Sequence, residues 1–120
     1  PTPSANVMRW VGEQSEAALY LSALSLGEIE QGIARLAGDI KKQRLAAWAR
    51  NTLLDRFGDR VVPVDAKVTA SWGSFQGQRK QRLPVIDDLI AATARVHHLT
   101  LVTRNIADFG RFDIPLWNPW

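Results

Sequence analysis

The chain has 120 residues, of which 46% are hydrophobic, and it contains no cysteine. This length is enough for a single domain with a hydrophobic core, and no apolar run approaches the ~20 residues that a membrane span needs. No signal peptide is expected, and the lack of cysteine excludes disulfides and thiolate metal sites and fits a reducing, cytoplasmic location. The net charge of +3 is compatible with a phosphate-rich partner but is also common in ordinary soluble proteins.

The first half of the chain predicts three helices around one strand. Ser4 and Ser25 are residue types that cap helix N-termini, and each precedes apolar residues at helical spacing. Alternation and β-forming residues favour a strand in between. The expected elements are a helix from Ser4 to Gly12, a strand over residues 17–24, a helix over residues 26–36 and a helix over residues 40–57.

The second half predicts alternating strands and helices. Pro63 argues for an edge strand or a strand end, and Asp65 is placed to cap a helix. The acidic pair Asp87-Asp88 opens an apolar helix that ends near His97. The other expected elements are a strand over residues 60–64, a helix from residue 66 through Trp72, a loop or frayed helix end over residues 73–82, and strands over residues 99–103 and 113–117.

Strands that alternate with helices indicate a parallel sheet covered on both faces, which is a three-layer α/β/α sandwich. The number of strands is low for that architecture, because four short strands, one of them at an edge, leave the sheet without a well-defined central strand. The pattern therefore also suggests that one strand is absent from this chain.

Four polar residues are candidates for chemistry: Glu28, Asp87, Asn105 and Asp108. Each follows a strand or opens a helix, so each is expected at the carboxyl edge of a parallel sheet, where ligands bind. Carboxylate and amide oxygens without cysteine are ligands for a hard cation, Mg²⁺ or Mn²⁺. Such an ion would relieve the repulsion between clustered carboxylates and could activate water at a phosphate.

Each of these residues also has a purely structural explanation. Ser25 and Glu28 match a capping box, in which the glutamate bonds back to the N–H of the cap residue. Asp87 is expected in a first helical turn, where acids favour the helix dipole, and Asn105 and Asp108 suit turns and caps. The expected convergence at one sheet edge is what favours the functional interpretation.

Other chemistries fit the sequence less well. It has no glycine-rich dinucleotide or P-loop motif and no nucleophile elbow around a serine. His97 and His98 are adjacent at a helix end, where they favour the dipole rather than bind metal together. Trp48 and Trp72 fall on apolar helix faces and are expected in the core.

Two motifs resemble a known family. The patterns Asp-x-x-Ile-Ala-Ala-Thr-Ala and Thr-Arg-Asn-x-x-Asp-Phe are similar to those of PIN-domain ribonucleases of the VapC/FitB toxin type. The resemblance implies a PIN-like α/β/α sandwich around a parallel sheet and RNA cleavage with Mg²⁺ or Mn²⁺. The matching stretches are residues 21–36, 83–98, 99–109 and 117–120.

The resemblance also assigns roles to residues. It implies that Glu28 and Asp87, rather than Asp88, are metal ligands. Asn105 occupies the fourth acidic position, where it is a weaker and neutral ligand, and Asp108 one turn later is expected to supply charge to the metal site. Thr103 is expected to hold hydrogen bonds of the site.

The sequence departs from the family pattern at its start. Family members begin with a central strand that ends in Asp-Thr-Asn, whose aspartate is a metal ligand, whereas Pro1 falls where the first helices already begin. The whole chain is therefore expected to be one PIN-like domain, N-terminally truncated relative to the pattern.

The resemblance implies an endoribonuclease that leaves a 5′-phosphate and a 3′-hydroxyl, with a small antitoxin protein and a homodimer as partners. Arg104 and the basic stretch with Arg79, Lys80 and Arg82 are expected to bind the RNA backbone, although a plain solvated surface explains that stretch equally well. Two alternatives stay open: an inactive or incomplete PIN module that binds its antitoxin without catalysis, and a housekeeping RNA-processing nuclease.

Overall fold

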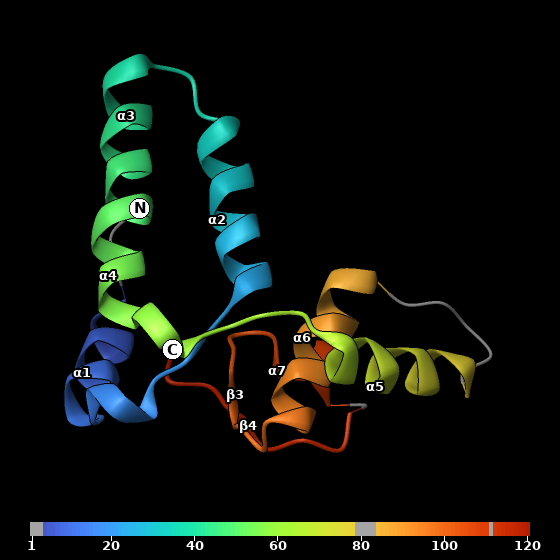
Figure 1. Ribbon diagram of the computed structural model, residues 1–120. Coiled ribbons are helices and arrows are strands. Elements are labelled where there is room, and N and C mark those ends of the chain that lie inside the picture. Colours follow the sequence, from blue (N-terminus) through green and yellow to red (C-terminus); the bar gives the residue numbers. More distant parts are fainter. Residues whose placement is uncertain (1–3, 79–83, 111) are drawn as a thin grey trace. The chain divides into compact units, whose positions relative to one another are not determined.

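The computed structural model describes residues 4–78, 84–110 and 112–120 (Figure 1). The chain forms two compact units. Residues 19–63 make one of them, which we call the inserted unit, and the described residues before and after that segment make the other, which we call the main unit. Among the described residues, no helix combines the length and the apolar character that crossing a membrane requires.

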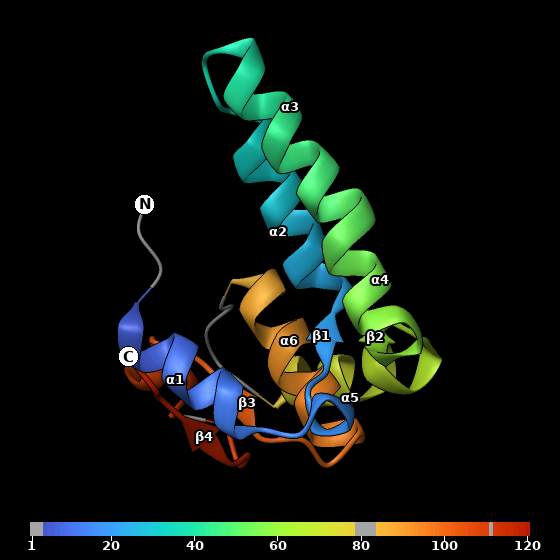
Figure 2. The same cartoon turned by 90° about the vertical axis from the view of Figure 1, so that its left-hand side faces the viewer.

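The inserted unit is a helical hairpin that begins and ends in a short strand. Its elements are β1 (Leu21–Ser22), α2 (Ala23–Ala34), α3 (Asp39–Ala47), the π-helical η2 (Trp48–Leu53), α4 (Leu54–Phe57), the 3-10 helix η3 (Gly58–Arg60) and β2 (Val61–Val62). The predicted parallel pairing is confirmed, because β1 runs parallel to β2 with Leu21 opposite Val61. The helix predicted over residues 40–57 is confirmed in extent, although the π-helical segment η2 interrupts it. It lies beside α2 in Figures 1 and 2.

The strand predicted over residues 17–24 is wrong in extent. A 3-10 helix, η1 (Glu16–Ala18), precedes β1, and α2 already begins at Ala23. The reason is that Ser22 is the helix cap: its Oγ accepts a hydrogen bond from the N–H of Leu24 at 3.1 Å. Ser25, which the sequence favoured as the cap, therefore lies inside the first turn of α2.

Two features hold the inserted unit together. Its buried apolar residues come from both arms of the hairpin and from β2: Ile33, Ala49, Leu53 and Val62. At the strand end of the hairpin, the guanidinium of Arg60 donates hydrogen bonds to the carbonyl oxygens of Leu19, at 2.7 Å, and Arg56, at 2.6 Å. These bonds tie the entry of the unit to its exit.

The first two long helices of the main unit are α1 (Ala5–Glu13) and α5 (Ala66–Gly77), and both carry the predicted caps. The Ser4 Oγ accepts the N–H of Val7 at 3.4 Å, and the Asp65 Oδ1 accepts the N–H of Val68 at 3.0 Å. Residues 73–82 were predicted to be a loop or a frayed helix end, and the loop is wrong as far as Gly77, because α5 is still helical there. Residues 79–82 of that stretch lie outside the described residues.

The rest of the main unit consists of α6 (Val85–Val96), β3 (Leu101–Val102), α7 (Ile106–Phe109) and β4 (Leu116–Trp117). The predicted helix near Asp87 is confirmed. It ends in a Schellman motif, in which His98 adopts a left-handed φ of 55° and Leu99 N–H bonds to the Ala94 carbonyl at 2.9 Å. The core of this unit is centred on Ala91, Phe109 and Phe112.

The strands of both units are parallel, as predicted, but they form two separate two-stranded sheets, β1–β2 and β3–β4. In the second sheet Leu101 lies opposite Leu116, and Val102 lies opposite Trp117. Every strand has two residues, so the predicted strands are present but shorter than expected. The β3–β4 pair positions one candidate residue, because the loop with Asn105 follows β3.

Candidate functional site

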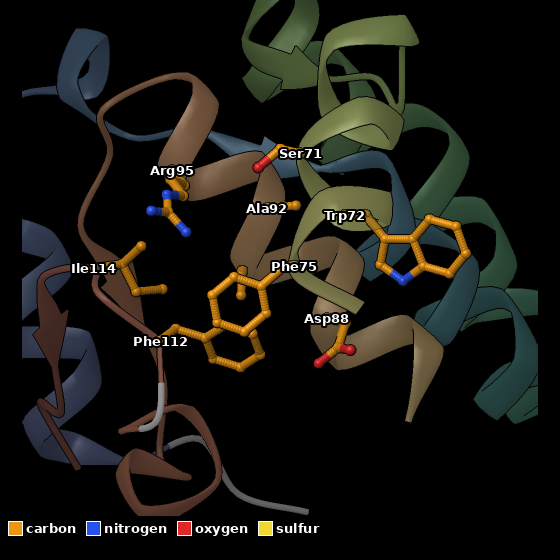
Figure 3. A pocket seen from close by; sticks show the side chains of 9 residues that line it. Ser71, Trp72, Phe75, Asp88, Ala92, Arg95, Phe112 and Ile114 are labelled. Atoms are coloured by element: carbon orange, nitrogen blue, oxygen red, sulfur yellow. The ribbon is translucent and has the colours of Figure 1, made fainter. Parts of the chain in front are cut away.

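The two aspartates that open α6 lie in different environments. Asp88 is only 2% exposed and accepts a hydrogen bond from the side-chain amide of Gln76 in α5. With Ala91, Ala92 and Arg95 it occupies the helix face that lines a small cavity (Figure 3). The spacing of three, four and seven residues from Asp88 is that of one helix face. Asp88 is therefore part of the packing between α5 and α6.

Asp87 is the more available carboxylate of the pair. It is half-buried in the first turn of α6, and no hydrogen bond or ion pair joins it to another residue in the described part of the chain. The side chain of the preceding cap residue, Pro84, makes no capping bond. The positive end of the helix dipole favours a carboxylate at this position. Asp87 is thus held on a packed helix while its oxygens keep their ligand capacity.

Asn105 and Asp108 lie together at the start of α7. The N–H of Asp108 donates to the carbonyl of Asn105 at 3.1 Å, and both side chains are exposed. Asn105 occupies the N-cap position, yet its side chain makes no capping hydrogen bond. The cap explanation therefore does not account for the Asn105 amide.

Thr103 connects this loop to the sheet. Its N–H donates to the carbonyl of Trp117 at 2.9 Å, and its hydroxyl oxygen accepts the N–H of Asn105 at 3.0 Å. The expected role of Thr103 in local hydrogen bonding agrees with this geometry. The end of β3 thus fixes the backbone from which Arg104 and Asn105 project.

Glu28 belongs to the inserted unit, where it is exposed in the second turn of α2. The capping-box explanation for Glu28 is wrong, because Ser22 and not Ser25 caps the helix. Among the described residues Glu28 has no hydrogen bond or ion pair. Its carboxylate has no structural role that the helix itself explains.

The donors fit a divalent cation in type but not in number. Asp87, Asp108 and Asn105 offer only oxygen, as Mg²⁺ and Mn²⁺ prefer. Across residues 4–78, 84–110 and 112–120, however, no group of three or more His, Asp or Glu side chains is arranged to hold a metal ion. The described residues therefore offer suitable oxygen atoms but do not form a closed metal site.

The basic residues expected to contact RNA are only partly described. Arg104 is exposed at the bend between β3 and α7, and no ion pair joins it to a carboxylate within the described residues. Arg79, Lys80 and Arg82 lie outside the described residues.

Sequence reasoning missed the cavity beside Asp88. Trp72 and Phe75 of α5 line it together with Phe112, and the buried indole Nε1 of Trp72 has no hydrogen-bond partner among the described residues. Trp72 was expected in the core and is half-buried, whereas Trp48 is 43% exposed and is not the core residue that was expected. The helical spacing from Asp88 to Arg95 was the available signal for the cavity.

A second hollow lies between the helices of the inserted unit. It is lined by charges of both signs, including Glu30, Asp39, Lys42 and Arg50, and Arg50 pairs with Glu30 at 3.6 Å. Charges of both signs that neutralise one another do not form a cation site, so this hollow is not an alternative metal site.

The class of protein follows from comparison with known families. Residues 3–114 match the PIN domain family, and the chain belongs to it. The match extends over both compact units. The expected PIN-like fold with parallel strands is confirmed.

Individual relatives agree with this assignment. The chain is 32% identical over 123 residues to the toxin FitB of Neisseria gonorrhoeae, and the match covers 100% of this chain and 88% of that protein. It is 29% identical over 121 residues to the VapC ribonuclease Y4jK of Sinorhizobium fredii, covering 98% and 86%. The crystal structure of FitAcB from Neisseria gonorrhoeae superposes with a TM-score of 0.90 at 32% identity, covering 100% of this chain and 88% of the other.

Proposed function

We propose that this protein is a Mg²⁺- or Mn²⁺-dependent endoribonuclease that acts in the cytoplasm as the toxin of a toxin–antitoxin pair. Membership of the PIN domain family and similarity to a protein named as a toxin and to one named as a ribonuclease support the proposal. The observation that carries the site is the contrast at the start of α6: Asp88 is packed and hydrogen-bonded, whereas Asp87 has no hydrogen-bond or ion-pair partner among the described residues.

In this proposal Asp87 and Glu28 hold the cation, together with the aspartate that the family carries on a strand ahead of the first helix. Asn105 and Asp108 hold a second ion or orient water. When bound, such an ion activates water and offsets the charge that develops on the scissile phosphate. Thr103 positions Asn105 through the hydrogen bond to its N–H.

We propose that basic side chains near the site bind the phosphate backbone of the RNA. Arg104 is one residue from Asn105 and is exposed, so its guanidinium can reach a phosphate without giving up an ion pair described in this structure. Arg79, Lys80 and Arg82 are proposed to add further phosphate contacts.

The first experiment is an RNA cleavage assay with purified protein in Mg²⁺, Mn²⁺ and EDTA. Asp87→Ala is expected to lower the cleavage rate by at least ~100-fold, because a metal ligand contributes several kcal/mol to the transition state. The fold should remain, since Asp87 makes no hydrogen bond or ion pair among the described residues.

Asp113→Ala is the matched control, because Asp113 is an exposed acid of the same unit with no proposed role. It should cleave like the wild type. Full activity in Asp87→Ala, or cleavage that persists in EDTA, contradicts the proposal.

The proposed partners are a small antitoxin protein and a second copy of the chain. Growth arrest on expression, relieved by a small protein encoded next to this one, would support the toxin role. Growth without arrest, combined with metal-dependent cleavage, would favour a housekeeping RNA-processing nuclease of the same chemistry.

One observation favours a second candidate, a PIN module that binds its antitoxin without catalysis. In the part of the chain that the structure describes, no three acidic or histidine side chains gather as a metal site. Cleavage can be compared between the 120-residue chain and a chain extended by an aspartate-bearing first strand. Activity in the extended chain alone would assign the binding role to the shorter one.

A further inference from the structure

Trp117 is a solvent-exposed aromatic residue next to the loop that carries Arg104 and Asn105. Its side chain is 49% exposed, although it stands on a strand. Its carbonyl accepts the N–H of Thr103, so Trp117 is bonded to the residue that begins the polar loop with Arg104 and Asn105. Figures 1 and 2 both show β4 next to β3. The exposed side chains of Trp117 and Arg104 thus lie at or just after the ends of neighbouring strands.

The strand register explains why Trp117 is not in the core. Leu101 and Leu116 lie opposite each other, and both pack against the buried cluster of Ala91, Phe109 and Phe112. Because side chains alternate between the faces of a strand, the next pair, Val102 and Trp117, belongs to the opposite face. The exposure of Trp117 follows from its register and not from a frayed strand.

The backbone around Trp117 is fixed on both sides. Before it, the Leu101 N–H donates to the Pro115 carbonyl at 2.9 Å. After it, the Asn118 side chain accepts the N–H of Trp120 at 2.9 Å, and the Asn6 amide donates to the main-chain oxygen of Trp120 at 2.8 Å. An aromatic side chain on a fixed backbone can be contacted with little additional loss of conformational entropy.

We infer that Trp117 is a stacking platform for an unpaired base of a single-stranded RNA whose backbone Arg104 contacts. Proteins bind single-stranded RNA by combining base stacking on aromatic rings with cations along the phosphates, and this pair of residues offers both. The inference rests on the proposed ribonuclease function and adds Trp117 as a residue that binds an unpaired base of the substrate. Stacking on an indole accepts any base, so Trp117 contributes affinity without selecting a sequence.

The test is a fluorescence anisotropy titration in EDTA, which separates binding from cleavage. The probes are a labelled single-stranded oligoribonucleotide and an abasic oligonucleotide of equal length. Trp117→Ala is expected to raise the Kd for the RNA about tenfold and to leave the Kd for the abasic probe unchanged, because stacking needs a base. Trp117→Leu should give the same loss, and Trp117→Phe should stay within about threefold of the wild type.

Trp48→Ala is the matched control, since Trp48 is 43% exposed and belongs to the inserted unit. Its Kd for RNA should equal that of the wild type. Circular dichroism and thermal unfolding show whether each variant is folded, and Trp117→Leu, which keeps an apolar side chain but cannot stack, keeps the test valid if Trp117→Ala unfolds.

Three results would overturn the inference: an unchanged Kd in Trp117→Ala, an equal loss on the abasic probe, or a loss of equal size in Trp48→Ala. These results leave the proposed function standing as long as the wild type binds RNA. A wild type that binds neither probe contradicts the proposed function and the inference together.

Discussion

The inward face of α6 and the loop between β3 and α7 belong to the same unit, but their polar side chains differ in burial and in hydrogen bonding. On the helix face, Asp88 is buried and receives a hydrogen bond from Gln76. In the loop, Asn105 and Asp108 are exposed, and the Asn105 side chain makes no capping bond. Burial and hydrogen bonding identify Asp88 as a structural carboxylate, which acid type and sequence position alone do not.

Asp87 combines features of the two regions, because it lies on the same helix as Asp88 but is less buried. Burying a carboxylate is costly unless hydrogen bonds compensate, which explains why Asp88 carries its amide partner. Asp87 has no such requirement, since it is only half-buried. We therefore expect changes at Asp88 to affect stability and changes at Asp87 to affect ligand binding.

The largest stability effect in this comparison is expected for Asp88→Ala. The substitution removes the acceptor of the Gln76 amide and opens space in the α5–α6 packing. Loss of a buried charged hydrogen bond typically costs ~1–3 kcal/mol, and urea unfolding followed by circular dichroism measures it. Asp87→Ala serves as the neighbouring control and should change the free energy of unfolding by less than ~1 kcal/mol. Equal losses in the two variants would remove the distinction between them.

A smaller effect is expected for Thr103→Val in the loop. Valine keeps the shape of threonine but cannot accept the N–H of Asn105, so the start of α7 loses one local hydrogen bond. The free energy of unfolding should fall by about 0.5–1.5 kcal/mol. Hydrogen exchange at the Asn105 amide should accelerate, and unchanged exchange would mean that this bond does not hold the loop.

Much of the fold was predictable because its signals are local. The caps Ser4 and Asp65 and the helix at Asp87 depend on neighbouring residues only, and the structure confirms all three. The cap of α2 was not predictable in the same way, because Ser22 and Ser25 both fit the local pattern. The pairing of β1 with β2, which joins residues 40 positions apart in the chain, decides between them.

Prediction of the candidate site from the sequence is limited in the same way. The sequence identified Asp87 over Asp88 only through family resemblance, and the physical reason appears when Gln76 of α5 is seen to bond to Asp88. Likewise, α5 runs to Gly77 although that segment is rich in polar residues and glycine, because α5 packs along α6. Contacts between distant segments, which periodicity does not encode, determine these details.

The most direct measurement of the central claim is a Mn²⁺ titration of the wild type, Asp87→Ala and Asp88→Ala, monitored by calorimetry and paired with thermal unfolding. We expect Asp87→Ala to lose Mn²⁺ binding while keeping the unfolding temperature of the wild type. Asp88→Ala should keep Mn²⁺ binding at a temperature where it is folded and should unfold several degrees earlier. Mn²⁺ binding that survives in Asp87→Ala but disappears in a folded Asp88→Ala would contradict the account.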